Sequence, residues 1–186
     1  MLTEIRVAGL GGQGVILAGM ILGKSASLYD AKHATLTQSF GPEARGSACS
    51  AQVIVADEPI LYPYLTQTHI LVALSQEACQ RFGRELRPGG KLIYEKDLVR
   101  PEKVRADVEL FGIPATRLAE ELGRRMVLNI VMVGFITALT SLVSLPAVRQ
   151  AVANSVPAGT EKLNLAALET GYEFGRDLLR QPQSAA

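Results

Sequence analysis

A cluster of glycines near the N-terminus is the first feature of the sequence that could do chemistry. Gly9, Gly11 and Gly14 fall on the G-x-G-x-x-G spacing, directly after a short apolar run and directly before a helical pattern. In such a strand-to-helix turn, backbone N–H groups and the N-terminus of the helix face the ligand, and both attract an anion. The sequence therefore predicts a phosphate-binding loop whose backbone donors come from Gly11, Gly12, Gln13 and Gly14.

A second candidate segment lies at residues 38–47, with the sequence QSFGPEARGS. Gly41-Pro42 is a turn signal, and Glu43 and Arg45 follow just beyond the expected end of a strand. A guanidinium group binds phosphate or carboxylate in a forked geometry, and Glu43 would hold either Arg45 or a ligand hydroxyl. The alternative is a surface ion pair, which contributes little to stability. The residues alone give both interpretations equal weight.

The elements that must position these two segments follow an alternating strand and helix pattern. Such a pattern is typical of an α/β domain with a mostly parallel sheet, whose ligands bind outside the carboxyl ends of the strands. We expect a three-layer Rossmann-like domain with a glycine-rich first βαβ unit and a helical C-terminal third. Strands are expected at Glu4–Gly9, Lys32–Ser39, Ala48–Ala56, His69–Leu74, Lys91–Tyr94 and Val108–Ile113, and helices at Val15–Tyr29, Gln76–Leu86 and Thr116–Arg125.

The length and composition bound the class of protein. With 186 residues and 48% hydrophobic residues, one domain over residues 1–186 is expected, with a frayed tail at 181–186. A formal net charge of +1 favours neither a nucleic-acid groove nor a polybasic membrane face. Cys49 and Cys79 lack metal-ligand spacing, and no signal peptide precedes the first strand pattern. The sequence thus predicts a cytoplasmic chain that forms no metal or iron–sulfur site by itself.

An uncharged stretch runs from Met126 to Val148. Its length meets the requirement for a membrane span, but its polar residues, Gly134 and Pro146 argue against one. We expect a helix buried in the domain or between subunits. Because such a helix needs cover on every side, it is the best compositional indication of a partner protein.

A nicotinamide or flavin site is the main alternative for the glycine turn. Such a site requires an acidic residue about 20 residues beyond the glycines, at the end of the second strand, to bind the ribose. Here the expected strand ends in Thr37, Gln38 and Ser39, while Asp30 precedes it. The dinucleotide interpretation therefore lacks its second requirement.

The two motifs together resemble the gamma subunit of 2-oxoacid:ferredoxin oxidoreductases. The resemblance rests on residues 5–19, IRVAGLGGQGVILAG, and 38–46, QSFGPEARG, with further similarity around Asn129, at 156–161 and at 167–172. The residue pattern of the second motif, FGPEAR, more closely resembles the 2-oxoglutarate or branched-chain type than the pyruvate type. Ser47 departs from the family, where a second glycine usually follows Gly46.

The resemblance implies a subunit that is not active alone. In that family, a 2-oxoacid is oxidatively decarboxylated on thiamine diphosphate, electrons pass through iron–sulfur clusters to ferredoxin, and the acyl group goes to coenzyme A. Thiamine diphosphate, Mg and the clusters are then expected on alpha, beta and ferredoxin-like delta subunits. Coenzyme A is expected at a cleft lined by this chain. No catalytic or metal-binding residue is assigned to this chain, and the expected cofactor-binding residues are Gly11, Gly12, Gln13, Gly14, Ser39, Gly41, Pro42, Glu43, Arg45 and Gly46.

Two other functions stay open at the level of sequence. One is a self-sufficient Rossmann oxidoreductase that binds NAD or FAD, and the other is a purely structural assembly subunit. Self-association of the isolated chain into a homodimer is also left open. No nucleic-acid partner and no membrane span are expected.

Overall fold

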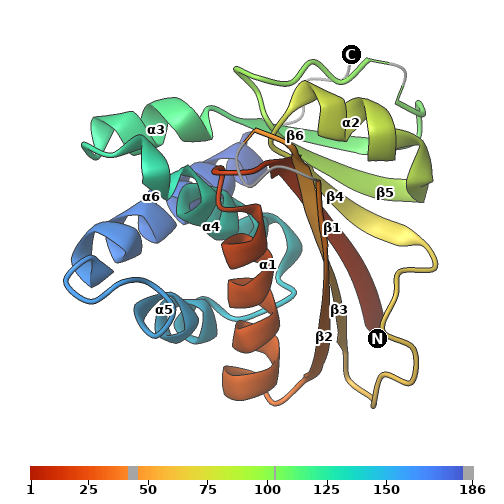
Figure 1. The fold of residues 1–186 in the computed structure, drawn as a ribbon, viewed down its shortest axis with the longest axis horizontal. Helices are drawn as coiled ribbons and strands as arrows, with labels where there is room; N and C mark the ends of the chain where they lie inside the picture. Colours follow the sequence, from red (N-terminus) through yellow and green to blue (C-terminus); the bar gives the residue numbers. More distant parts are fainter. Residues whose placement is uncertain (42–45, 103, 182–186) are drawn as a thin grey trace.

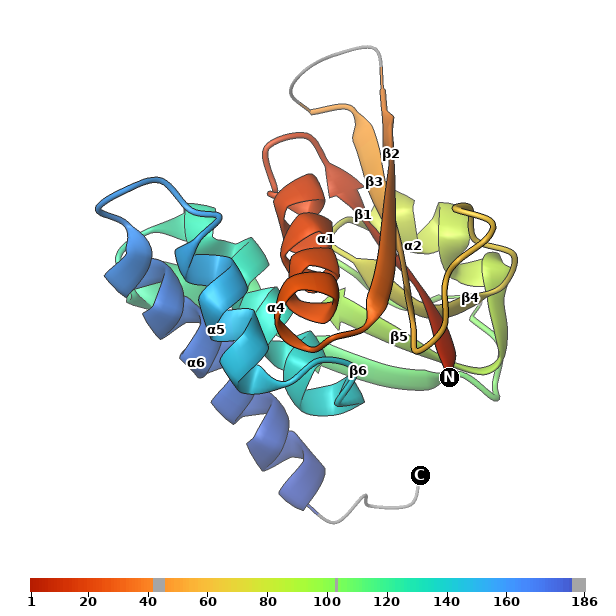
Figure 2. The same cartoon turned by 90° about the horizontal axis from the view of Figure 1, so that it is seen from below.

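A twisted sheet of six strands, in the order β2-β3-β1-β4-β5-β6, forms the centre of the molecule. The computed structural model describes residues 1–41, 46–102 and 104–181, and Figures 1 and 2 show the sheet from two directions. The strands are β1 (Leu2–Leu10), β2 (His33–Phe40), β3 (Ala48–Ala56), β4 (Thr68–Ala73), β5 (Leu86–Glu95) and β6 (Glu109–Ile113). The sheet confirms the predicted α/β class.

The helices form two unequal layers around this sheet. One face carries α1, α4, α5 and α6, whereas α2 covers the other face. The helices are α1 (Val15–Lys24, extended by a π turn at Ser25–Tyr29), α2 (Gln76–Phe82), α3 (Ala115–Glu121), α4 (Leu128–Thr140), α5 (Leu145–Ala153) and α6 (Glu161–Arg180). The larger hydrophobic core lies beneath the first layer.

The order of the first three strands differs from a simple βαβ unit. Strands β1 and β2 were expected to be neighbours, but β3 lies between them and is antiparallel to both. The cause is the β2–β3 hairpin, which turns back and pairs its second strand with β1 along nine positions, from Leu2↔Ala56 to Leu10↔Ala48. Strands β1, β4, β5 and β6 are parallel. The hairpin therefore brings the beginning of β3 beside the glycine turn.

The uncharged stretch does not form a single helix, and other helices of the same chain cover its buried part. It begins within the 3-10 turn at Arg125–Val127 and continues through helix α4 to the beginning of α5, with a left-handed residue, Ser141, between the helices. Every residue from Leu128 to Ala138 is buried within this chain. Of the two expected settings for this stretch, the structure shows burial within the domain, because α6, α3, α1 and α5 cover α4.

The second predicted helix is shorter than expected. It ends at Phe82, and a 3-10 turn leads into β5, which begins at Leu86 and continues through Pro88-Gly89-Gly90. Pairing with β4 explains the difference: Thr68 lies opposite Leu86, and a bulge follows before Ile70 pairs with Lys91. The Pro-Gly-Gly stop signal thus marks a bulged strand instead of a loop.

The C-terminal end of the chain follows the long helix α6. Of the predicted tail, Gln181 comes directly after α6, and residues 182–186 lie outside the described residues. Among the described helices, none is both long and apolar enough to cross a membrane.

Candidate functional site

The glycine turn is joined to the return of the β2–β3 hairpin by backbone hydrogen bonds. The Gly11 N–H donates to the Ser47 carbonyl oxygen at 2.8 Å, and the Gly46 N–H donates to the Gly11 carbonyl oxygen at 3.3 Å. Gly12 and Gly14 adopt φ angles of 98° and 71°, which a side chain would strain. The two segments that the sequence singled out therefore meet at the carboxyl end of β1.

The Gln13 side chain holds the turn from inside the protein. Its Oε1 accepts from the Leu10 N–H at 2.7 Å, and its Nε2 donates to the Leu74 carbonyl oxygen at 2.8 Å. Its backbone N–H donates to the Leu10 carbonyl oxygen at 3.1 Å. Both ends of its amide are thus engaged in joining the end of β1 to the end of β4.

Asn129, at the beginning of α4, fixes the other end of the turn. Its side chain is 3% exposed, and its Nδ2 donates to the Gly14 carbonyl oxygen at 3.3 Å. A Cβ atom at Gly14 would collide with the Asn129 side chain. Gly14 is therefore required for packing as well as for its φ angle, and the turn is rigidly built into the core.

The outer side of the turn presents unused backbone donors to a groove. Within the described part of the chain, the N–H groups of Gly12 and Gly14 have no hydrogen-bond partner. The first N–H groups of α1 point the same way, because the intrahelical bonds begin with Ala18 donating to Gly14. The groove has a volume of about 630 Å³. It is lined by Gly11, Gly12, Gly14, Val15, Ile16, Leu17, Phe40, Gly41, Ser47 and Cys49.

The structure brings only some of the predicted site residues together. Gly11, Gly12, Gly14 and Gly41 line the groove, and Gly46 borders it through its bond to Gly11. Ser39 lines a different pocket, because alternate residues of a strand point to opposite faces of the sheet. Pro42, Glu43 and Arg45 lie outside the described residues.

The described residues offer little else for redox or metal chemistry. No group of three metal-ligating side chains is found among them. Asp30, the acid nearest to a dinucleotide position, accepts instead from the Ser144 N–H and hydroxyl groups at the start of α5. Burial raises the pKa of the Cys49 thiol, so the reactive thiolate is disfavoured there. The groove is thus suited to binding an anionic ligand.

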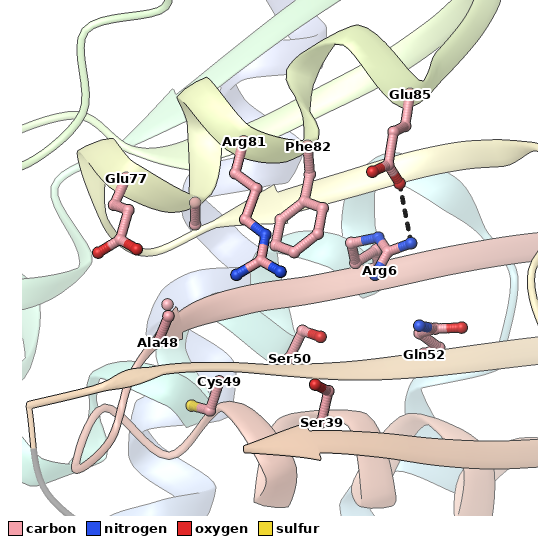
Figure 3. Close-up of a pocket in the computed structure, with 12 residues that line it drawn as sticks. Arg6, Ser39, Ala48, Cys49, Ser50, Gln52, Glu77, Arg81, Phe82 and Glu85 are labelled. Carbon is pink, nitrogen blue, oxygen red and sulfur yellow. Dashed lines mark hydrogen bonds and ion pairs between the residues drawn. The ribbon is translucent and has the colours of Figure 1, made fainter. Parts of the chain in front are cut away.

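Sequence reasoning missed a second pocket, which lies on the α2 side of the sheet (Figure 3). Its floor comes from β1, β2 and β3, and its wall comes from α2 and the turn after it. The signal was present in the strand alternation: Arg6, Ser50 and Gln52 are polar residues that lie between apolar residues of β1 and β3. Without the β2-β3-β1 strand order, nothing indicated that these residues face the same cavity.

Comparison with known proteins gives a consistent result. Residues 4–174 match the family model described as pyruvate ferredoxin/flavodoxin oxidoreductase. The 2-oxoglutarate synthase subunit KorC of Methanocaldococcus jannaschii is 47% identical, over 96% of each chain. The crystal structure of a keto/oxoacid ferredoxin oxidoreductase gamma subunit from Geobacter sulfurreducens superposes with a TM-score of 0.81 at 39% identity, covering 93% of this chain and 98% of that one.

A larger structure shares the fold. The 2-oxoglutarate:ferredoxin oxidoreductase from Magnetococcus marinus, with 2-oxoglutarate, coenzyme A and succinyl-CoA bound, superposes with a TM-score of 0.87 at 21% identity. The match covers 98% of this chain but 32% of that one. The same α/β domain thus also occurs as one part of a longer chain.

The fold is an α/β domain with a glycine turn at the end of its first strand, and the comparisons place it among oxidoreductase subunits. The chain belongs to the pyruvate ferredoxin/flavodoxin oxidoreductase family, as a gamma subunit of a 2-oxoacid:ferredoxin oxidoreductase. The sequence resemblance to that family is confirmed.

Proposed function

We propose that this chain is the gamma subunit of a 2-oxoglutarate:ferredoxin oxidoreductase and that it forms the coenzyme A side of the active-site cleft. The observation that carries the proposal is the groove of about 630 Å³ at the glycine turn, which is lined by the first residues of α1 and by Gly12 and Gly14, whose N–H groups have no partner among the described residues. The nearly full-length similarity to a 2-oxoglutarate synthase subunit supports the choice of substrate.

The chemistry of coenzyme A fits the groove, which combines backbone N–H groups of the glycine turn with an apolar surface. Its phosphates would accept hydrogen bonds from the N–H groups of Gly12 and Gly14, where the positive end of the helix dipole also favours an anion. Its uncharged pantetheine arm would pack on Val15, Ile16 and Phe40, and the last of these is 66% exposed. The coenzyme A bound to the Magnetococcus marinus enzyme, which contains the same fold, also supports this ligand.

Glu43 and Arg45, which lie outside the described residues, have proposed roles that rest on the sequence alone. Arg45 would supply a charge-assisted contact to a phosphate, and Glu43 would orient Arg45 or a ligand hydroxyl. Ser47, where the family usually has glycine, lines the groove next to Gly41. Compared with a glycine, its side chain would narrow the groove at this point.

The remaining chemistry belongs to other subunits. Decarboxylation on thiamine diphosphate with Mg, and electron transfer through iron–sulfur clusters, would take place on alpha, beta and delta subunits in the cytoplasm. This chain would bind and orient coenzyme A so that its thiol reaches the acyl group. The isolated chain is then expected to be inactive.

The substrate assignment is tested with the complex assembled from this chain and the subunits that copurify with it. We expect coenzyme A-dependent reduction of ferredoxin with 2-oxoglutarate, and kcat/KM at least about tenfold lower with pyruvate or 2-oxoisovalerate, equivalent to about 1.4 kcal/mol of transition-state discrimination. Preference for either of the other acids would contradict the 2-oxoglutarate assignment while leaving the subunit class intact.

A further inference from the structure

We propose that the pocket on the α2 side of the sheet is a binding site for an oxyanion group, either a phosphate or a carboxylate. The pocket has a volume of about 280 Å³, which suits a small ligand or the charged end of a larger one. It lies on the face of the sheet opposite α1, and its lining shares Cys49 with the glycine-turn groove. The inference does not depend on the proposed coenzyme A site.

Two arginines meet at one aromatic ring in this pocket. The Cζ atoms of Arg6 and Arg81 lie 4.3 Å and 5.1 Å from the centre of the Phe82 ring. Arg6 rises from β1 and Arg81 descends from α2, so the cavity is approached by guanidinium groups from two elements (Figure 3). Stacking on an aromatic face orients a guanidinium group and leaves its N–H donors directed outward.

Only one of these two charges is balanced inside the protein. Arg6 Nη2 donates to Glu85 Oε2 at 2.9 Å, and the Arg6 side chain is 11% exposed. Arg81 makes no ion pair within the described residues. Burial lowers the pKa of Arg6, the ion pair with Glu85 opposes that shift, and repulsion from the nearby Arg81 adds a smaller lowering. An oxyanion beside Arg81 would relieve this repulsion.

The floor of the pocket adds neutral hydrogen-bonding groups. Ser39 on β2 and Ser50 on β3 lie opposite each other in the sheet register, and both line the cavity below Arg81. Gln52 follows two positions along β3, on the same face. A hydroxyl or amide donates to an anion's oxygen as readily as a backbone N–H does, so the arginine and the two serines together form a set of donors for one oxyanion.

Glu77 is a negatively charged residue of the pocket and weakens its attraction for an anion. Its carboxylate lines the opposite end of the cavity from Glu85 (Figure 3). Like charges repel, so Glu77 reduces the affinity for an anion that Arg81 attracts. This opposition predicts that neutralising the two residues changes affinity in opposite directions.

Amide NMR titration of the full chain tests the site. Inorganic phosphate and succinate are added separately at constant ionic strength, and we expect saturable shifts at Ser39, Ser50 and Arg81 with one or both probes. A response to phosphate alone or to succinate alone identifies which oxyanion is preferred. If neither probe gives a saturable shift at these three amides, the proposal is overturned, and shifts confined to residues 11–17 would assign the binding to the glycine turn instead.

Charge-neutralising variants distinguish binding in this pocket from a non-specific effect of the net charge of the protein. Arg81→Gln should raise the dissociation constant about tenfold, the order expected for losing one charged hydrogen bond. Glu77→Gln should lower it. Arg84→Gln is the matched control, because it removes the same charge from the next turn of chain, and Arg84 does not line this pocket. Equal dissociation constants for the wild type, Arg81→Gln and Arg84→Gln would overturn the assignment.

Discussion

The Gly171→Ala variant should lose about 3 kcal/mol of its free energy of unfolding, because it places a methyl group where two helices touch through their backbones. The added Cβ atom would collide with the carbonyl group of Val131, whose carbon lies 2.7 Å from the Cβ position. Gly134 makes the reciprocal contact with the backbone of Leu168 and Tyr172. Since a backbone cannot rotate away as a side chain does, α4 and α6 would have to separate and leave voids in the core.

Urea denaturation of the purified chain measures this loss, and Gly23→Ala is its control. Gly23 also lies in a helix, but the atom nearest to the Cβ position of an alanine there, Val53 Cγ1, is 4.0 Å away. Alanine at this position should be neutral or should stabilise the chain by up to about 1 kcal/mol through its higher helix propensity. A Gly171→Ala variant as stable as Gly23→Ala would refute the close α4–α6 contact.

Gly12→Ala should raise the KM for coenzyme A roughly tenfold in the assembled complex, which corresponds to about 1.4 kcal/mol of lost binding. No atom of the described residues lies within 4 Å of the Cβ position at Gly12, and Gly12 lines the groove, so we expect the methyl group to project into it. There it would hold a phosphate away from the N–H groups that are expected to bind it. The variant should still fold, with some stability lost to the strain of a side chain at a φ angle of 98°, because the methyl group meets no atom of the described residues.

Gly123→Ala is the matched control for backbone strain. Gly123 has a φ angle of 92°, close to the 98° of Gly12, and its Cβ position is equally open. It follows α3 and does not line the groove. Both variants should lose similar stability, but only Gly12→Ala should change the KM. If Gly12→Ala impairs assembly and leaves the KM unchanged, the glycine turn has the purely structural role that the sequence left open.

The sequence predicted those parts of the fold that depend on residues close together in the chain. Apolar runs, alternation at 48–56 and β-branched residues at 32–39 predicted all six strands, and the glycine spacing predicted the turn between β1 and α1. The position of β3 between β1 and β2 could not be predicted in this way, because it depends on pairing between residues far apart in the sequence, such as Leu2 and Ala56. The burial of α4 within this chain likewise depends on its close contact with α6, which forms only after folding.

The candidate site was predictable to the same extent. Glycine spacing indicated which backbone groups could face a ligand, and Gly12 and Gly14 do present N–H groups that have no partner in the described part of the chain. The inward side chain of Gln13 and the placement of Ser39 on the other face were not foreseen. Both depend on the path of neighbouring strands, since Gln13 is held by the end of β4 and Ser39 by its register with Ser50.

Hydrogen–deuterium exchange of the assembled complex, with and without coenzyme A, tests the proposed role of this chain most directly. The N–H groups of Gly12 and Gly14 and the first N–H groups of α1 are unpartnered in the described chain, so they should exchange rapidly without ligand. Saturating coenzyme A should slow exchange in the peptide that covers residues 11–17. Unchanged exchange in this peptide, with protection only in other subunits, would contradict a coenzyme A site at the glycine turn.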